Sequence, residues 1–166
     1  QISLIAKMNI KRNVEKFISL IDKDKWEKKY FAIYWPLKDE IDLRFLKTKY
    51  PVALPKSQSN KNLDFYIWDD SPLIKDIKGI PSPNNNHKLQ HKHISFIFVP
   101  CISVDKNLNR LGYGGGYFDK LRSNKKWELI PCIGILTENC ISKDLLVKAD
   151  WDIPLSGLVT DKQILI

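Results

Sequence analysis

The sequence predicts an α/β fold in which a mainly parallel sheet lies between two layers of helices. Short apolar runs alternate along the chain with segments of helical spacing, the order expected when helices connect parallel strands. Several runs are apolar at every position, as strands buried on both faces are. The 166 residues suffice for one domain with a real core and are too few for two ordinary domains. We therefore expect a single three-layer α/β/α domain over residues 1–166.

The first half of the chain predicts one long helix and three short strands. Between Ile5 and Ile21, apolar residues recur at a spacing that gives a helix one buried stripe. The apolar and aromatic run Tyr30–Trp35 predicts a buried strand, which Pro36 ends. The pattern further predicts a short helix at Glu40–Lys47 and strands at Val52–Leu54 and Asp64–Trp68.

The segment from Asp69 to His93 predicts a long loop. It holds prolines, three consecutive asparagines and all three histidines of the chain. Zinc ligation by His87, His91 and His93 is disfavoured, because no cysteine or carboxylate stands near them at ligand spacing. A polar surface loop is the preferred interpretation.

In the second half, Ile94–Val99 is the most strand-like stretch, and Pro100 ends it. A glycine-rich turn follows, and a helix is expected after it at Tyr117–Ser123. The remaining predictions are a strand at Ile130–Leu136, a helix at Ser142–Ala149 with Ser142 as its cap, and a final strand that begins at Leu158.

The composition narrows the class of partner. The net charge of +8 indicates anionic partners without saying which, and the lysines are scattered rather than gathered in a block. No apolar run approaches the roughly 20 residues that span a bilayer, and no secretory signal opens the chain. The chain starts at Gln1 rather than Met, so we expect that its extreme N-terminal segment is missing.

The cysteines predict a reducing, cytoplasmic environment. Their number is odd, and no pair has the spacing of a metal or redox motif, which argues against a disulfide framework and a cysteine zinc site. Cys101 and Cys132 each follow a proline beside an apolar run. We interpret both as small buried hydrophobic residues rather than nucleophiles.

The sharpest feature is a turn with four of the seven glycines, between Gly112 and Gly116. Glycine lets backbone N–H groups approach a ligand, and a turn that leads into a helix can cradle an anion. Arg110, just before the turn, can add a charge-assisted contact. The P-loop pattern is absent because no Gly-Lys followed by Ser or Thr occurs here. The dinucleotide pattern GxGxxG is absent because position 117 is Tyr. On composition alone, a tight connection without a ligand is the alternative.

The run Phe98–Lys120 resembles the signature of the 5-formyltetrahydrofolate cyclo-ligase family, also called methenyltetrahydrofolate synthetases. That signature is Val-Pro, a variable stretch ending in Asp, and then Arg-Leu-Gly-x-Gly-x-Gly-Tyr-Tyr-Asp-Arg. Supporting fragments run through most of the chain, at Tyr34–Asp42, Val52–Pro55, Asp152–Pro154 and Val159–Asp161. The resemblance implies a fold like that of NagB, RpiA and the CoA transferases.

The resemblance also implies a reaction. The family uses ATP and Mg²⁺ to convert 5-formyltetrahydrofolate to 5,10-methenyltetrahydrofolate, releasing ADP and phosphate in one-carbon metabolism. The formyl oxygen attacks the γ-phosphate, and N10 of the folate then attacks the activated carbon and displaces phosphate. Such a reaction needs positioning and neutralised charge more than a side-chain nucleophile. The expected partners are therefore two small molecules, with no membrane or nucleic acid, and the protein is expected to be a monomer.

Site residues follow from the same resemblance. Arg110 and Tyr117 would serve catalysis, and Asp119 and Asp152 would hold Mg²⁺. ATP would contact Arg110, Leu111, Gly112, Tyr113, Gly114, Gly115, Gly116, Tyr117 and Phe118. The folate would contact Trp35, Glu40, Tyr113, Gly114, Gly115, Gly116 and Tyr117.

Four of these residues have a plain structural interpretation as well. Asp119 suits the first turn of a helix, and Asp152 suits a surface turn before a proline. Glu40 is equally explained as a helix cap, and Trp35 as a core residue.

Three departures from the family pattern bear on activity. The family carries Lys-x-x-x-Arg on its first helix, whereas Lys7-x-x-x-Lys11 has the spacing in a register that is late relative to Tyr34. Ser82 stands where the family often has Glu before a proline, and Phe118 replaces a tyrosine.

Two other functions are alternatives. One is a non-catalytic relative that binds nucleic acid, suggested by the positive charge with Trp68 and Trp127. The other is a different phosphoryl-transfer or sugar-phosphate enzyme on a similar fold, since fold alone does not set function.

Overall fold

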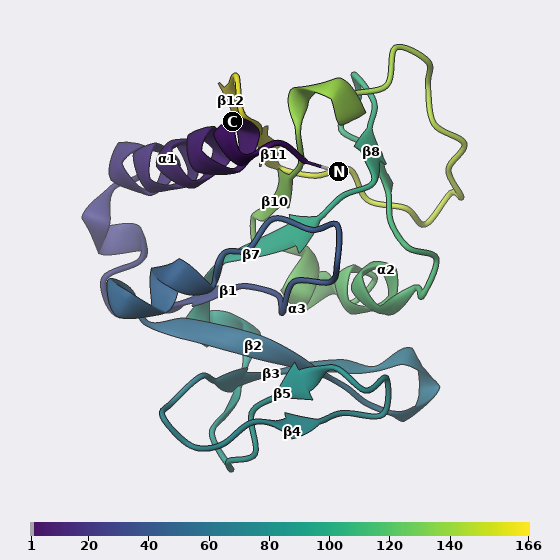
Figure 1. The fold of residues 1–166 in the computed structure, drawn as a ribbon. Helices are drawn as coiled ribbons and strands as arrows, with labels where there is room; N and C mark the ends of the chain where they lie inside the picture. The colour runs from purple at the N-terminus through teal and green to yellow at the C-terminus, as the bar shows by residue number, and fades with distance from the viewer. Residues whose placement is uncertain (1) are drawn as a thin grey trace.

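Five apolar strands pair in parallel at the centre of the protein. The computed structural model describes residues 2–166, and its main sheet has eight strands in the order β12-β11-β10-β7-β1-β2-β3-β6 (Figure 1). The parallel strands are β1 (Tyr30–Ala32), β2 (Val52–Ser57), β7 (Ile94–Pro100), β10 (Cys132–Ile135) and β11 (Gly157–Val159). Antiparallel strands extend the sheet at both edges: β3 (Leu63–Ile67), β6 (Lys88–Leu89) and β12 (Ile164–Leu165).

Strand β7 divides its side chains between two cores. All seven of its residues are buried, because strands flank it on both sides and helices cover both faces of the sheet. Successive side chains point to opposite faces, so Phe96 and Phe98 join one apolar cluster while Ile97 and Val99 join the other. The alternation confirms the expectation of a sheet buried on both faces.

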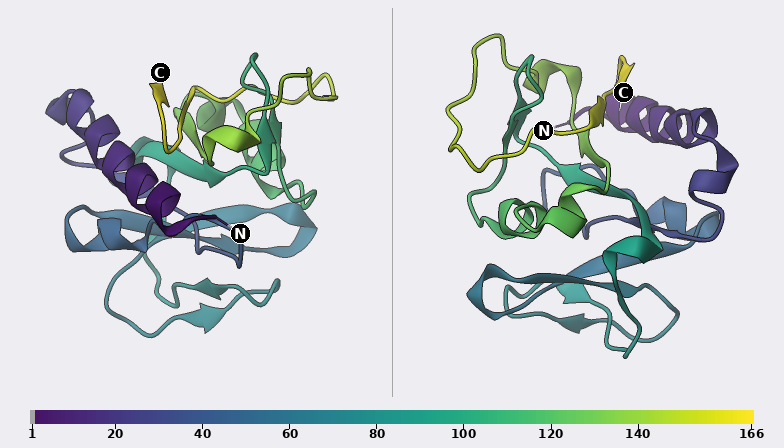
Figure 2. Two further views of the ribbon diagram at one scale, coloured as in Figure 1. Left: turned by 45° about the horizontal axis from the view of Figure 1, so that its top comes forward. Right: turned by 180° about the vertical axis from the view of Figure 1, so that it is seen from behind.

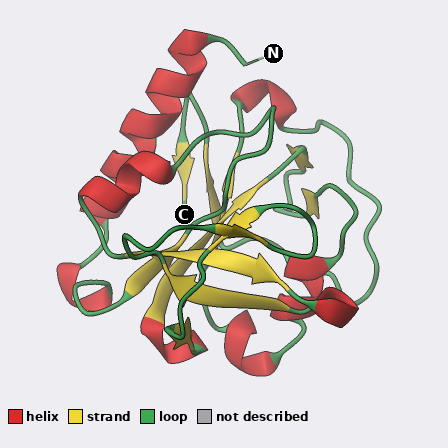
Figure 3. Cartoon of the chain, turned by 60° about the horizontal axis from the view of Figure 1, so that its bottom comes forward, coloured by secondary structure: helices red, strands yellow, loops and turns green. Residues whose placement is uncertain are grey.

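Helix α1 (Leu4–Leu20) covers the first face. Ser3 caps it by accepting the backbone N–H of Ala6, and its buried stripe consists of Ile10, Val14, Phe17 and Ile18. The Phe17 ring meets Phe96 and Phe98 edge to face, at centroid distances of 5.6 and 5.9 Å. Figure 3 shows the strands with α1 lying alongside them.

The second face is covered by α2 (Tyr117–Arg122) and α3 (Lys125–Glu128). Leu121 from α2 and Ile130 after α3 pack in the second cluster with Ile97 and Leu158. Seen from behind, α2 and α3 lie on the opposite side of the sheet from α1 (Figure 2). The predicted three-layer α/β/α fold is confirmed, and its likeness to NagB and RpiA stays a prediction. Within residues 2–166, no helix combines the length and apolar character needed to cross a membrane.

The segment predicted as a long loop contains short paired strands. Strands β4 (Ile74–Lys75) and β5 (Pro81–Ser82) form a hairpin, and β6 joins the main sheet. Single 3₁₀ turns connect other elements: η1 (Lys23–Lys25), η2 (Arg44–Thr48), η3 (Ser59–Lys61), η4 (His91–His93) and η5 (Glu138–Cys140).

Two predicted helices are wrong. Residues 142–149 form irregular chain, because Leu145 and Val147 are exposed at 57% and 102% and supply no buried stripe. The short helix expected at Glu40–Lys47 is only the later 3₁₀ turn η2. There the Asp42 carboxylate accepts the backbone N–H and the guanidinium of Arg44, and this local pairing starts the turn two residues after Asp42.

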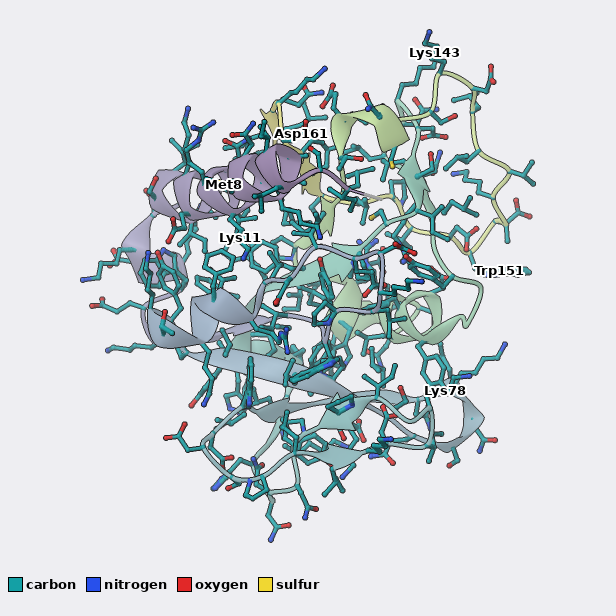
Figure 4. The ribbon with its side chains drawn as sticks, viewed as in Figure 1. Met8, Lys11, Lys78, Lys143, Trp151 and Asp161 are labelled. Atoms are coloured by element: carbon teal, nitrogen blue, oxygen red, sulfur yellow. The ribbon has the colours of Figure 1, made fainter. Side chains whose placement is uncertain are left out.

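We predict that Phe98→Ala lowers the free energy of unfolding by about 3–5 kcal/mol, because it leaves a cavity where Phe17 and Phe31 now meet the Phe98 ring. Urea unfolding measures the change. Trp151→Ala is the matched control: this side chain is 70% exposed and projects from the edge of the molecule (Figure 4), so its loss should cost under about 0.5 kcal/mol. Equal effects of the two changes would contradict the proposed core.

Candidate functional site

The glycine turn lies between a hairpin and a helix. Strand β7 ends at Pro100, and the hairpin of β8 (Ser103–Val104) and β9 (Arg110–Leu111) follows it. The turn then leads into α2, whose N-cap Gly116 has φ +73°, a left-handed conformation that favours glycine. The turn therefore stands just beyond the carboxyl end of the central strand, where ligands of parallel α/β sheets bind.

One buried carboxylate shapes the hairpin. Asp105 is 1% exposed, and its side chain accepts the backbone N–H groups of Asn107, Asn109 and Leu146 and the amide of Asn109. Burial by itself would raise the pKa of this carboxyl, but the hydrogen bonds outweigh burial and lower the pKa below its usual value. Asp105 thus fixes the hairpin that delivers Arg110 and ties irregular residues 142–149 to it.

Arg110 is held beneath the turn. Its Nη1 donates to the carbonyl of Pro100 at 3.2 Å, and its Nη2 lies 3.6 Å from Oδ1 of Asp119. The guanidinium also lies over the Phe118 ring, 5.5 Å from the centroid. A Cβ at Gly112 would lie 2.6 Å from Nη1, so this glycine is required for the guanidinium to occupy its place.

A small cavity brings several predicted residues together. Arg110, Phe118, Asp119 and Asp152 all line it, although Asp152 lies more than thirty residues further along the chain. Its volume of about 40 Å³ has room for little more than a water molecule or an ion. The Asp152 carboxylate accepts the backbone N–H of Ala149 at 2.7 Å, as a turn residue does. Asp152 therefore stabilises a turn and also lines the cavity.

The two carboxylates fit part of a magnesium shell. Carboxylate oxygens are the hard ligands that Mg²⁺ prefers, and Asp119 and Asp152 face one cavity. Among residues 2–166, no group of three or more His, Cys, Asp or Glu side chains could hold a metal. The residues therefore suit an ion that takes its other ligands from phosphate and water rather than from a complete protein cage.

Arg122 explains how Asp152 reaches the cavity. This side chain is buried, and its Nη1 donates to the carbonyls of Ile153 and Pro154 at 2.7 and 3.0 Å. Helix α2 and the segment around Asp152 are thereby joined. Sequence reasoning missed this role, because an arginine at the end of a short helix looks like a surface residue.

Glu40 lies near enough to the turn to interact with its charges. Its carboxylate accepts the backbone N–H of Leu37 at 2.8 Å, so it closes a local turn and does not cap the helix that the sequence predicted. Burial raises the pKa of Glu40, and the Leu37 hydrogen bond and the Arg110 charge partly offset the rise. The pKa of Tyr113 is raised by burial and by the Glu40 carboxylate. Glu40 therefore lies close enough to Arg110 and Tyr113 for their charges to interact.

Trp35 is placed differently. Its ring packs edge to face with Trp68 and lies under the Arg44 guanidinium, 4.5 Å from the ring centroid. It is half-buried against the cluster beneath α1. These contacts are those of a core residue and do not by themselves join Trp35 to the turn.

A lysine that sequence reasoning passed over lies beside the turn. Asn60 and Lys61 form the tip of the β2–β3 hairpin with φ of 56° and 58°. A Cβ at Gly116 would lie 3.6 Å from Nζ of Lys61, and Lys120 of α2 donates to the carbonyl of Asn60. Lys11 belongs to the Lys7-x-x-x-Lys11 pair that has the spacing of the family's first-helix motif. Its Nζ lies over the Phe45 ring, 5.4 Å from the centroid (Figure 4).

Cys132 is buried in the second apolar cluster, and Cys101 is half-buried against it. Burial raises the pKa of Cys101 to about 12 and that of Cys132 to about 11. Both thiols are therefore protonated at neutral pH, so neither is a ready nucleophile. All three cysteines are free.

The fold and the site define a three-layer α/β protein with a glycine turn, a fixed arginine and two carboxylates beyond the carboxyl edge of its sheet. Comparison with known proteins gives the class. A model described as the 5-formyltetrahydrofolate cyclo-ligase family matches residues 19–161. The chain therefore belongs to the 5-formyltetrahydrofolate cyclo-ligase family, and it is an enzyme of the ligase class.

Named relatives agree with the family. The 5-formyltetrahydrofolate cyclo-ligase of Haemophilus influenzae is 27% identical over 141 residues, covering 79% of this chain and 75% of that protein. That of Escherichia coli K12 is 27% identical over 116 residues, covering 69% of this chain and 63% of that protein.

Solved structures agree as well. The 5,10-methenyltetrahydrofolate synthetase of Aquifex aeolicus matches with a TM-score of 0.71 and 27% identity, covering 96% of this chain and 83% of that one. The synthetase of Mycoplasma pneumoniae, at 22% identity and a TM-score of 0.67 over 96% of this chain and 90% of that one, supports the fold.

We predict that Asp105→Asn lowers the free energy of unfolding by about 1–3 kcal/mol at neutral pH, because an amide cannot accept all four donors. The lowered pKa means that the carboxylate stabilises the fold above its usual pKa of 3.8, and that this stability is lost as pH falls through the folded value. The gap between wild type and variant should therefore narrow in acid. A gap independent of pH, in urea unfolding at several pH values, would argue against this role.

Proposed function

We propose that the protein uses ATP and Mg²⁺ to cyclise 5-formyltetrahydrofolate to 5,10-methenyltetrahydrofolate, with release of ADP and phosphate. The observation that carries the proposal is the joint placement of Arg110, Asp119 and Asp152 around one cavity beneath the glycine turn. Family membership supplies the reaction class, and this geometry suits a phosphoryl transfer within it.

The turn from Arg110 to Phe118 is proposed to bind the ATP phosphates. Its glycines leave backbone N–H groups open to a ligand, and Tyr113, Gly114 and Gly115 in its middle are exposed. Arg110 supplies a fixed positive charge from below, and Lys61 stands beside Gly116 with another. Together these groups can neutralise charge on a transferring phosphoryl group.

Asp119 and Asp152 are proposed to hold Mg²⁺ against the phosphates. When bound, the ion would neutralise charge on the phosphate oxygens. The two carboxylates need to face the cavity, and the contacts with Arg110 and with the backbone N–H of Ala149 favour that orientation.

The folate is proposed to lie on the Glu40 side of the turn. Glu40 can accept hydrogen bonds from the pterin, and Tyr113 and Tyr117 offer aromatic faces and hydroxyls. Trp35 and Glu40 are the two folate contacts proposed from the segment Tyr34–Asp42. Of these, Glu40 is the one whose charge interacts with Arg110 at the turn. Trp35 would need to contact the folate from its place beside Trp68.

The chemistry needs no protein nucleophile. The formyl oxygen forms a bond to the γ-phosphorus as the bond to ADP breaks, and N10 then closes the ring as phosphate leaves. Arg110 is proposed to stabilise the transferring phosphoryl group, and Tyr117 to orient the folate beside it. The high pKa values of Cys101 and Cys132 agree with the absence of a thiol step.

We further propose that residues 1–166 act as one cyclo-ligase domain, monomeric and in the cytoplasm, with small molecules as partners. The free cysteines support a reducing compartment.

The direct test mixes the protein, Mg-ATP and 5-formyltetrahydrofolate and follows the absorbance of the methenyl product. We expect product in proportion to ADP. A protein that consumes no ATP and instead binds RNA strongly in low salt would overturn the proposal in favour of a nucleic-acid-binding relative.

Arg110→Ala is expected to lower kcat/KM by about 10²–10³-fold, as the loss of one fixed charge donor does at other phosphoryl- and acyl-transfer sites. Arg12→Ala removes an exposed arginine of α1 and serves as the matched control, with an unchanged rate. Circular dichroism checks that both variants fold. Similar rates for the two variants would remove Arg110 from the site.

Glu40→Gln is expected to raise KM for the folate about tenfold and leave KM for ATP nearly unchanged, because a neutral amide loses the charge-assisted bond to the pterin. The raised pKa of Glu40 adds a pH signature: folate KM of the wild type should rise at low pH, beginning above the usual carboxyl value of 4.5. The variant should lack this rise. Asp39→Asn, at the exposed neighbouring position, is the control.

A further inference from the structure

Both carboxylates of the cavity already have partners in the protein without ligands. Oδ1 of Asp119 lies 3.6 Å from Nη2 of Arg110, and Oδ2 of Asp152 accepts the backbone N–H of Ala149. The Arg110 side chain is only 13% exposed, whereas Asp119 is 49% exposed. Asp119 is therefore half-open to solvent, and a fixed positive charge stands on its inner side.

The charge around the cavity disfavours a bare cation. Arg110, Arg122 and Lys148 line it together with Asp119 and Asp152, so three positive groups meet two negative ones. A free divalent ion would bring two more positive charges into a space with an excess of positive charge. It would also compete with Arg110 for the same carboxylate oxygen.

A nucleotide changes both conditions. Its phosphate groups add several negative charges, and phosphate oxygens accept from a guanidinium in two-pronged geometry at least as well as a carboxylate does. Once Arg110 turns its Nη2 to phosphate, Oδ1 of Asp119 is free. The contact with the Pro100 carbonyl uses Nη1 and can persist through this exchange.

We propose that Arg110 occupies the place of the metal at Asp119 until nucleotide arrives, so that metal and nucleotide bind cooperatively through an exchange of partners. The inference rests on the proposed function and assigns Arg110 a second role, as the residue that couples the two ligands. By linkage, whatever factor the nucleotide adds to the affinity for metal, the metal adds to the affinity for nucleotide.

This exchange predicts that loss of Arg110 raises the affinity for a bare divalent cation, whereas loss of an ordinary site residue lowers the affinity for a ligand. Removing the Arg110 charge should weaken nucleotide binding and at the same time tighten the binding of a bare divalent cation. A positive charge that merely stands near the cavity would also repel the cation, but it would do so whether or not Asp119 carries its carboxylate, and a charge at Lys148 would act in the same way.

The experiment titrates the protein with Mn²⁺, read by the electron paramagnetic resonance of the free ion, without nucleotide or folate. Arg110→Gln is the main variant, since it removes the positive charge that faces Asp119 and keeps a polar side chain with N–H donors. We expect Mn²⁺ to bind about three- to tenfold more tightly than to the wild type. In the Asp119→Asn background, the same change should have no effect on Mn²⁺ affinity.

Lys148→Ala is the matched control, because it removes the same charge from the wall of the same cavity through an exposed side chain. It should change Mn²⁺ affinity less than about twofold. A non-hydrolysable ATP analogue, corrected for the Mn²⁺ that it binds in solution, should raise wild-type affinity at least about tenfold and that of Arg110→Gln less than about threefold.

Unchanged or weaker Mn²⁺ binding to Arg110→Gln overturns the exchange, as does an equal gain in Lys148→Ala or in the Asp119→Asn background. These titrations need no turnover, so they separate the two ideas. If wild type forms the methenyl product but Arg110→Gln does not bind Mn²⁺ more tightly, the exchange is wrong and the proposed function stands. If Mn²⁺ binding follows the prediction and no product forms, the reaction is wrong.

Discussion

The buried carboxylate of Asp105 is the interaction on which the site depends. It accepts four N–H donors, three of them from the turn that precedes Arg110 and one from residue 146. A carboxylate is buried at tolerable cost only when its oxygens are satisfied in this way. With this one group the protein closes the β8–β9 hairpin and holds a segment that has no regular structure. Arg110 follows directly after this turn, so the hydrogen bonds of Asp105 set its position beneath the glycine turn.

A second junction joins parts of the chain that are distant in sequence. Arg122 reaches from the end of α2 to the carbonyls of Ile153 and Pro154, which brings Asp152 beside Asp119. The buried guanidinium donates to backbone carbonyls and lines the same cavity as both carboxylates, with no ion pair of its own among the described residues. Backbone acceptors thus do the joining and leave the carboxylates for the cavity.

The site combines a rigid lower half with an open upper half. Arg110 is fixed by the Pro100 carbonyl, the Phe118 ring and the lack of a side chain at Gly112. In the glycine turn above it, Tyr113, Gly114 and Gly115 are exposed. A fixed charge beneath an exposed backbone turn suits a ligand whose charge moves during reaction, because the charged groups need no rearrangement.

The local pattern of the chain determined most of the layers. Periodicity alone predicted α1 and the central strands, because a stripe at helical spacing and a fully apolar run each have one way to become buried. It failed at residues 142–149, where the spacing was helical but Asp105 bound the backbone N–H of Leu146 and nothing covered Val147. Propensity there was outweighed by a tertiary hydrogen bond.

The sequence by itself also determined the glycine turn, the flanking Arg110 and Asp119, and the family they indicate. It could not show that Arg110 pairs with Asp119, that Asp152 lines the same cavity, or that Arg122 holds them together. Those contacts depend on how α2 packs against the sheet and on where the closing segment returns. The spacing of residues along the chain specifies local geometry. The distances between Arg110, Asp119 and Asp152 are decided only when the helices pack on both faces of the sheet and the two apolar cores form.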